Sequence, residues 1–143
     1  MKKAFLSIMI MASVLTAKGQ DGIADIQAHL FTDRISLEYS CTLAGEVPVK
    51  LSGTLLLQGD SYSVRGNGIE IYCNGGTRWT VDREAKEVYI EPADGLAEVT
   101  VYYESISELK IGKVEYSPLS DDLGAFIFDT SALGPDWVIT DLR

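Results

Sequence analysis

Few side chains in this sequence have the chemistry of an active site. His29 is its only histidine, and a nucleophilic triad needs a histidine placed beside its nucleophile. No partner stands near His29 in the sequence, so we expect a surface residue that is neither a base nor a metal ligand. Paired carboxylates could in principle hydrolyse a glycoside, but most acidic residues here alternate with apolar ones, which indicates a solvated face. We therefore expect a protein that is not an enzyme.

The spacing of potential metal ligands and phosphate-binding glycines is equally unpromising. Cys41 and Cys73 form no CxxC pair, which argues against a zinc site built from cysteine and histidine. Asp82 with Glu84, and the acidic pair at 121–122, lack the ligand spacing of a calcium loop and are better explained as turns. The glycine-rich segments lie between predicted strands, whereas phosphate-binding loops lead into helices. We expect no cofactor and no metal.

The elements that would position any site are mostly β-strands. Apolar and polar residues alternate with a period of two, the pattern of strands with one buried and one solvated face. This alternation covers residues 35–43, 49–57, 61–65, 69–74, 78–82, 87–91 and 98–104. Short turns rich in Gly, Asn and Asp separate the runs, as in consecutive β-hairpins. The sequence therefore predicts a continuous antiparallel meander from Ile35 to about Tyr103.

The segments that flank the meander complete the predicted fold. Residues 21–31 have a weak helical pattern with Ile26 on its apolar stripe. Towards the C-terminus we expect a short helical turn at 105–110 and strands at 111–116, 124–129 and 137–142. An apolar sheet face must be covered, and one short helix covers only part of it. The predicted fold is mainly β with one N-terminal helix, a curved antiparallel meander that forms an open, unclosed β-barrel.

The concave apolar face of this sheet is the candidate ligand-binding site, because lipid sites are built from unfilled concave apolar surface. We assign residues to it by the apolar parity of each strand. The candidates are Leu37, Tyr39, Leu55, Leu57, Trp79, Val81, Val88, Ile90, Val99 and Val101.

The N-terminus has the features of an export signal. Lys2 and Lys3 precede an apolar run at 4–15, and small residues around Gly19 suit a signal peptidase. The run is shorter than the about 20 residues of a membrane span. We expect residues 1–20 to be a signal peptide that is cleaved on export to the periplasm, and residues 21–143 to form a single, monomeric domain. Removing the first 20 residues changes the net charge from −9 to −12, which argues against nucleic acid as a partner.

Export to an oxidising compartment would favour a disulfide, but we expect Cys41 and Cys73 to stay unbonded. They fall in the first and fourth predicted strands, which a meander separates by roughly 14 Å. A disulfide needs Cα atoms within about 7 Å of one another.

Two stretches of the sequence carry a family resemblance. The first contains the step Gly53-Thr54-Leu55 and, further on, Asn74-Gly75 followed by Trp79; the second is the C-terminal segment 137–143. Both resemble the outer-membrane lipoprotein carrier family (LolA-like proteins), in its short Bacteroidetes-type branch, where a strand ends at G-x-L and D-G-x-x-x-W precedes a charged turn. The resemblance implies an open β-barrel, with helices in its mouth as a lid, that carries lipoprotein acyl chains across the periplasm.

The sequence departs from that family at its lid. Carriers of the family have a central helical segment, and here only residues 104–110 remain in its place. Carriers also place an arginine just after the G-x-L strand, where this chain reads Leu57-Gln58-Gly59-Asp60. The nearest arginine, Arg65, belongs to the polar face by its parity, so its role is not carried over.

The leading hypothesis is a periplasmic carrier that binds acyl chains of lipoproteins or other lipids and passes them from an inner-membrane donor protein to an outer-membrane acceptor protein. The alternative is a non-enzymatic β-sandwich interaction module that binds protein or glycan through Tyr72, Tyr89 and Tyr102, since aromatic clusters mark interfaces. Cross-strand packing is the simpler explanation of these tyrosines.

Overall fold

The computed structural model describes residues 23–93 and 106–143, and their strands form one sheet. A short helix, α2 (Ile23–His29), precedes six consecutive strands in which each pairs antiparallel with the next. These strands are β1 (Asp33–Leu43), β2 (Val49–Gln58), β3 (Ser61–Gly66), β4 (Ile69–Cys73), β5 (Thr77–Asp82) and β6 (Glu87–Pro92). The predicted meander is confirmed over this range. Its continuation at 98–104 lies outside the described residues.

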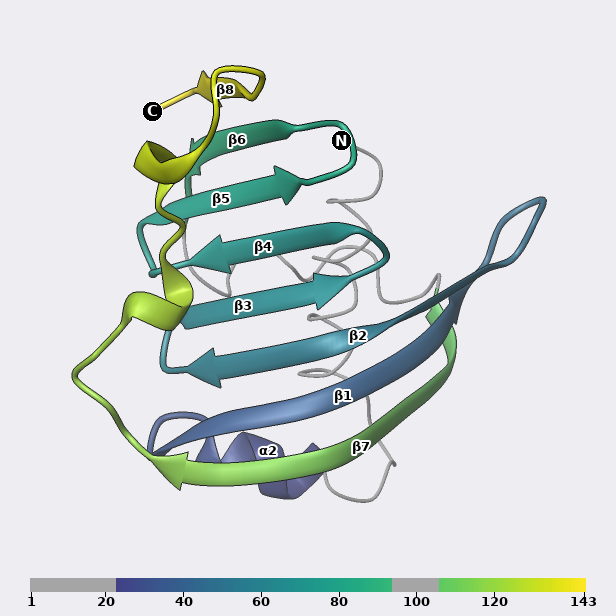
Figure 1. Ribbon diagram of the computed structural model, residues 1–143. Helices are drawn as coiled ribbons and strands as arrows, with labels where there is room; N and C mark the ends of the chain where they lie inside the picture. The colour runs from purple at the N-terminus through teal and green to yellow at the C-terminus, as the bar shows by residue number, and fades with distance from the viewer. Residues whose placement is uncertain (1–22, 94–105) are drawn as a thin grey trace.

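Two later strands extend the meander at its two sides (Figure 1). β7 (Ile106–Pro118) pairs antiparallel with β1, and β8 (Val138–Asp141) pairs parallel with β6. The strand order is β7-β1-β2-β3-β4-β5-β6-β8, so β7 and β8 are the two edges and the curved sheet does not close. The predicted class, mainly β with one helix and an open curved sheet, is therefore confirmed.

Two local predictions near the C-terminus are wrong. The helical turn expected at 105–110 is instead part of β7 from Ile106 onward, a long edge strand with two register shifts against β1. Positive φ angles at Glu108 (54°) and Lys113 (49°) accompany these irregularities, which interrupt a regular alternation and so conceal the strand in the sequence. The strand expected at 124–129 is a single 3-10 turn, η3 (Gly124–Phe126).

The pairing registers divide the sheet into two faces, because directly paired residues lie on the same face. Leu55 pairs with Val64, Val64 with Ile71, and Ile71 with Thr80. We call the face that contains this row the inner face. Ile26 of α2 belongs to the same buried cluster, so the inner face is the one on which the helix packs.

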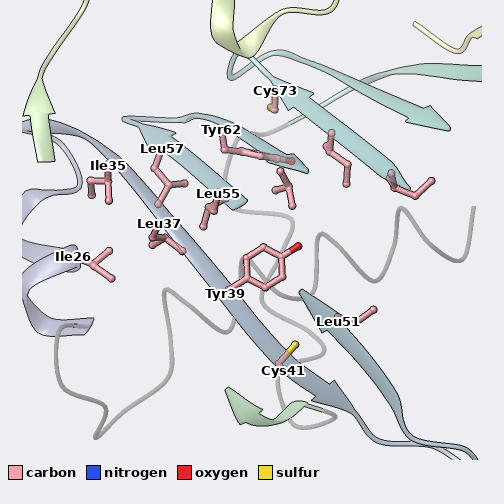
Figure 2. Packing of buried hydrophobic residues seen from close by; sticks show 13 residues of the cluster. Ile26, Ile35, Leu37, Tyr39, Cys41, Leu51, Leu55, Leu57, Tyr62 and Cys73 are labelled. Carbon is pink, nitrogen blue, oxygen red and sulfur yellow. The ribbon is translucent and has the colours of Figure 1, made fainter. Parts of the chain in front are cut away.

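The inner face carries the larger core (Figure 2). It combines Ile26 with buried residues from the first four strands, and partly buried residues of β7 pack against it. The buried members are Ile26, Ile35, Leu37, Tyr39, Cys41, Leu51, Leu55, Leu57, Tyr62, Val64, Ile69, Ile71 and Cys73. We call this set the inner cluster.

The opposite, outer face carries a second core near the other edge. Tyr72, Trp79, Val81, Val88 and Ile90 are buried there, and Phe128, Leu133 and Trp137 of the C-terminal segment pack against them. We call this set the outer cluster. Figure 1 shows the C-terminal segment, with η3 and η4 (Thr130–Ala132), crossing the ends of several strands on its way to β8.

Hydrogen bonds attach the start of this C-terminal segment to the outer face. The Gln58 side chain donates to the carbonyl of Ser120 (2.8 Å), and the Arg34 guanidinium donates to the carbonyl of Asp122 (2.8 Å). Arg34 also lies 5.1 Å from the ring centroid of Phe126, which is fully buried. The segment is thus held by polar contacts at one end and by apolar packing further along.

Candidate functional site

The structure brings together four of the residues predicted for the ligand site. Leu37 and Tyr39 of β1 and Leu55 and Leu57 of β2 all lie on the inner face and are at least 97% buried. Leu37 pairs directly with Leu55, and Leu57 with Ile35. Figure 2 shows Leu37, Leu55 and Leu57 between Ile26 and Tyr39. They form the centre of the largest apolar surface of the sheet.

Four other candidates lie on the opposite face, so the prediction of one shared face is wrong. Trp79 pairs with Tyr72 and Ile90, and Val81 pairs with Val88, all in the outer cluster. The inner positions of β5 and β6 are polar instead. The remaining two candidates, Val99 and Val101, lie outside the described residues.

Hairpin register is the physical reason for this correction. The turn at 74–76 places Arg78 opposite Cys73, which puts Trp79 opposite Tyr72 rather than opposite an inner residue. A one-residue change of register reverses the face of every side chain in a strand. The inward orientation expected for Trp79 is therefore wrong.

A pocket of about 570 Å³ adjoins one end of the inner cluster, where β1, β2 and β7 lie together. Cys41 and Leu51 belong both to its lining and to the inner cluster, and Leu109 of β7 joins them. Lys50 and Lys110 contribute to its polar side. The pairs Ser40–Ser52 and Thr42–Lys50 place most of the polar lining on the outer face, so Cys41, Leu51 and Leu109 are the part of the pocket that it shares with the inner side of the sheet.

Tyr39 lies within the inner cluster, in the row next to Cys41 and Leu51. Gly53 of β2 pairs directly with Tyr39, and Gly66 of β3 lies next to Gly53 in the same row across the sheet. A Cβ atom added to Gly53 would come within 2.8 Å of the Tyr39 hydroxyl and within 2.2 Å of the Arg65 carbonyl. The glycines therefore leave room for the tyrosine ring and for close approach of the strands.

Burial raises the pKa of the Tyr39 hydroxyl, and the neighbouring Cys41 thiol raises it further. The phenol is thus a neutral hydrogen-bond donor throughout the physiological range. Sequence reasoning placed Tyr39 on the apolar face but did not single out its hydroxyl. The Gly53 step opposite a β1 tyrosine is the signal that could have done so.

A polar row crosses the inner face at its other end. Tyr62, Cys73, Arg78 and Glu91 pair in sequence across four strands. The Arg78 guanidinium donates to the Glu91 carboxylate (2.9 Å). Burial raises the pKa of the Tyr62 hydroxyl and Cys73 adds to this, while the nearby Arg78 charge opposes it. This row bounds the apolar surface with a half-buried ion pair.

The histidine weighed for chemistry contacts Asp33 and Tyr116. His29 is 2.6 Å from the Asp33 carboxylate through Nδ1 and stacks on the Tyr116 ring at 4.1 Å, so it ties the end of α2 to β1 and β7. Hydrogen bonds from His29 and Thr32 hold the pKa of Asp33 below its usual value.

Two of the acidic residues that the sequence assigned to turns accept backbone hydrogen bonds there. The Asp82 carboxylate accepts from the Ala85 N–H (3.0 Å), and the Asp122 carboxylate accepts from the Gly124 N–H (2.9 Å). Within residues 23–93 and 106–143, no group of three or more potential ligands is arranged to hold a metal ion.

Of the residues assigned to the polar face, Arg65 lies where its parity places it, whereas Tyr72 is buried and lies on the opposite face from Tyr89. Arg65 lies on the outer face, 5.7 Å above the Tyr72 ring, as its parity indicated. Tyr72 is buried opposite Trp79, which confirms cross-strand packing at that position. Tyr89 is partly buried opposite Thr80 on the inner face, and Tyr102 lies outside the described residues.

Comparison of the chain with protein-family models and with curated proteins returned no match. Across the described part of the chain, no helix has the length and apolar character needed to cross a membrane. The candidate site therefore rests on its own geometry: an apolar inner face, a pocket at one end and a polar row at the other.

Proposed function

We propose that this protein is a non-enzymatic periplasmic carrier that binds the acyl chains of lipoproteins or other lipids on the inner face of its sheet. The observation that carries the proposal is the large apolar inner cluster, which spans α2 and the first four strands of an unclosed sheet. The pocket that shares Cys41 and Leu51 with this cluster has a volume of about 570 Å³, within the range of ligand-binding cavities.

The openness of the sheet supports the same function. Because β7 and β8 do not pair with each other, the sheet can change its curvature without breaking a closed ring of hydrogen bonds. A carrier must admit and release its ligand, and an unclosed sheet allows this more readily than a closed barrel. The resemblance to the lipoprotein carriers agrees with this interpretation, and it suggests a donor protein at the inner membrane and an acceptor at the outer membrane.

Co-purified lipid is the first test. The protein is exported in cells, purified from the periplasmic fraction and analysed by native mass spectrometry, followed by titration with a fluorescent fatty acid. We expect bound lipid in the first measurement and saturable binding in the second. Absence of both would refute the carrier.

A pair of charge substitutions on one strand locates the ligand. Leu57→Asp places a carboxylate in the buried inner cluster, and we expect it to abolish fatty-acid binding. Thr54→Asp adds the same charge at an exposed position of β2 and should leave binding intact. Circular dichroism identifies whether Leu57→Asp remains folded, and retained binding in a folded variant would contradict the proposed location.

The alternative is a module that binds another protein. The observation in its favour is the exposed apolar surface of the C-terminal edge, where Val138, Ile139 and Leu142 are 58%, 44% and 54% exposed. The described strands form one sheet rather than the two facing sheets of a sandwich. Fatty-acid binding separates the two functions, since an interaction module with a filled interior should not bind the probe.

A further inference from the structure

The Tyr39 hydroxyl is an unusual group for the middle of an apolar cluster. Its residue is only 3% exposed, and the hydroxyl has no hydrogen-bond partner among the described residues. A buried donor without a partner is destabilising, because folding removes its hydrogen bonds to water and returns none. Phenylalanine would fill the same space without that penalty.

Two glycines leave space for the hydroxyl oxygen of Tyr39. The ring lies over Gly53 and Gly66, and a Cβ atom at these glycines would come within 2.8 and 3.1 Å of the hydroxyl. Figure 2 shows Tyr39 between Leu55 and Leu51, within the inner cluster. The backbone thus accommodates a polar atom that contributes nothing to the stability of the protein alone.

The other buried hydroxyl of the inner cluster differs in its neighbours. The Tyr62 oxygen makes no hydrogen bond of normal geometry within the described residues, but the Arg78 guanidinium is near enough to lower its pKa. Tyr62 therefore has a cationic neighbour, whereas the residues of the inner cluster on either side of Tyr39 along β1 are Leu37 and Cys41.

Tyr39 lies in the row next to two residues that the pocket and the inner cluster share. Cys41, two residues along the same face of β1, and Leu51, two residues from Gly53 on β2, line both the pocket and the inner cluster. An acyl chain that lies along the inner face of β1, from the row of Leu37 to the row of Cys41, crosses the row of Tyr39 between them.

We propose, on the basis of the carrier function above, that Tyr39 is the polar anchor of the acyl site. Its hydroxyl donates a hydrogen bond to the carbonyl-type oxygen at the head of the bound acyl chain. The site therefore selects acyl compounds, whose head carries such an oxygen, over plain hydrocarbons of the same length. The oxygen can belong to a free fatty acid or to an ester, and the two sources differ in charge.

Three ligands of matched chain length test this selection in the intact exported protein. Palmitic acid, methyl palmitate and hexadecane each compete with diphenylhexatriene, an apolar fluorescent probe without an acceptor oxygen. The variants are Tyr39→Phe and, as a control for the same chemical change, Tyr116→Phe at a position that is 39% exposed. Melting temperatures without ligand are measured in parallel.

We expect Tyr39→Phe to weaken the two oxygen-bearing ligands about fivefold to tenfold, as loss of one buried hydrogen bond predicts. Binding of hexadecane and the probe should not change, and the melting temperature without ligand should be equal or higher. Tyr116→Phe should change none of these affinities. A loss for palmitic acid alone assigns the anchor to free fatty acids, and a loss for both assigns it to the acyl carbonyl in general.

Two results would overturn the inference, and they differ in their meaning. If the wild-type protein binds all three ligands and Tyr39→Phe alters none of them selectively, the anchor is wrong while the carrier function stands. If the wild-type protein binds neither the probe nor any of the ligands, the carrier function fails and the anchor fails with it.

Discussion

Cys41 and Cys73 lie on the same face of the sheet but far from each other. Both are buried and free. Cys73 of β4 is connected by direct strand pairing, through Tyr62 and Leu57, to Ile35 of β1, which is three strands away. Cys41 lies six residues further along β1 than Ile35. These steps correspond to roughly 14 Å across the sheet and about 20 Å along it, well beyond the reach of a disulfide. The prediction that they stay unbonded is confirmed.

Thiol titration without reductant measures this arrangement in solution. We expect two reactive thiols per chain after denaturation, and slow reaction of both in the native protein because both are buried. Burial also raises the pKa of the Cys41 thiol, which lowers its reactive thiolate fraction. Finding no reactive thiols in a denatured monomer would show that the strand order is wrong.

Glu70 lies on the outer face and takes part in several hydrogen bonds. Its side chain accepts hydrogen bonds from Arg83 and from the Tyr72 hydroxyl, the latter at 2.6 Å. Burial raises the pKa of Glu70, but the bonds from Arg83 and Tyr72 outweigh it, and the pKa lies below the ordinary value of 4.5. The charged form is therefore favoured by folding.

This shift predicts how Glu70 contributes to stability at different pH. Because the folded pKa is lowered, the contribution is complete above the unfolded pKa and is lost as the pH falls through the folded pKa. We expect Glu70→Gln to lower the free energy of unfolding by about 2 kcal/mol at pH 7, with a smaller difference at pH 3. Urea denaturation at both values checks this. Glu115→Gln on the exposed side of β7 should have little effect at pH 7, and a pH-independent loss for Glu70→Gln would contradict the assignment.

At the scale of elements, the C-terminal segment decides which face of β5 and β6 is buried. Its Phe128, Leu133 and Trp137 cover the outer cluster, and Phe126 of η3 packs where β3 and β4 meet the segment. The segment then enters the sheet as β8, with the Val138 N–H donating to the Lys86 carbonyl (2.9 Å). It is a structural layer of the domain rather than a tail.

Phe126 and its neighbour Ile127 provide a matched test of this layer. Phe126 is fully buried, whereas Ile127 is 45% exposed. We expect Phe126→Ala to lower the free energy of unfolding by about 3–5 kcal/mol. Ile127→Ala, which removes an exposed side chain from the next position, should cost about 1 kcal/mol or less. Similar values for both variants in urea denaturation would mean that the segment is not docked on the sheet as described.

At the scale of the whole molecule, one sheet supports two separate apolar clusters on opposite faces. The outer cluster is covered by the C-terminal segment and has a structural role. The inner cluster adjoins the pocket and is the proposed ligand site. Stability and ligand binding should therefore depend on different sets of residues, although both sets are equally buried.

Leu55→Ala and Ile90→Ala separate the two roles. Leu55 of the inner cluster is 2% exposed and Ile90 of the outer cluster is 4% exposed, so each truncation should cost about 2–5 kcal/mol of stability. We expect fatty-acid affinity to fall about fivefold in Leu55→Ala, through roughly 1 kcal/mol of lost apolar contact, and to stay unchanged in Ile90→Ala. An equal effect of both variants on affinity, measured where each is folded, would contradict an inner-face site.

The sequence by itself determined the strands of the meander and the open class of the sheet. Period-two alternation and short polar turns are local signals, and they located β1 to β6 and β8 with small errors at their ends. The same alternation placed Leu37, Tyr39, Leu55 and Leu57 on one face, because β1 and β2 are long and pair in a simple register.

Only the tertiary structure decided which face each strand turns towards the helix. Alternation distinguishes two sides of a strand without saying which is inner, and the turn at 74–76 sets the register that turns Trp79 and Val81 outward. The C-terminal segment then makes that orientation favourable by covering the outer cluster. Burial of this kind depends on residues about 50 positions apart in the chain, and no local pattern contains that information.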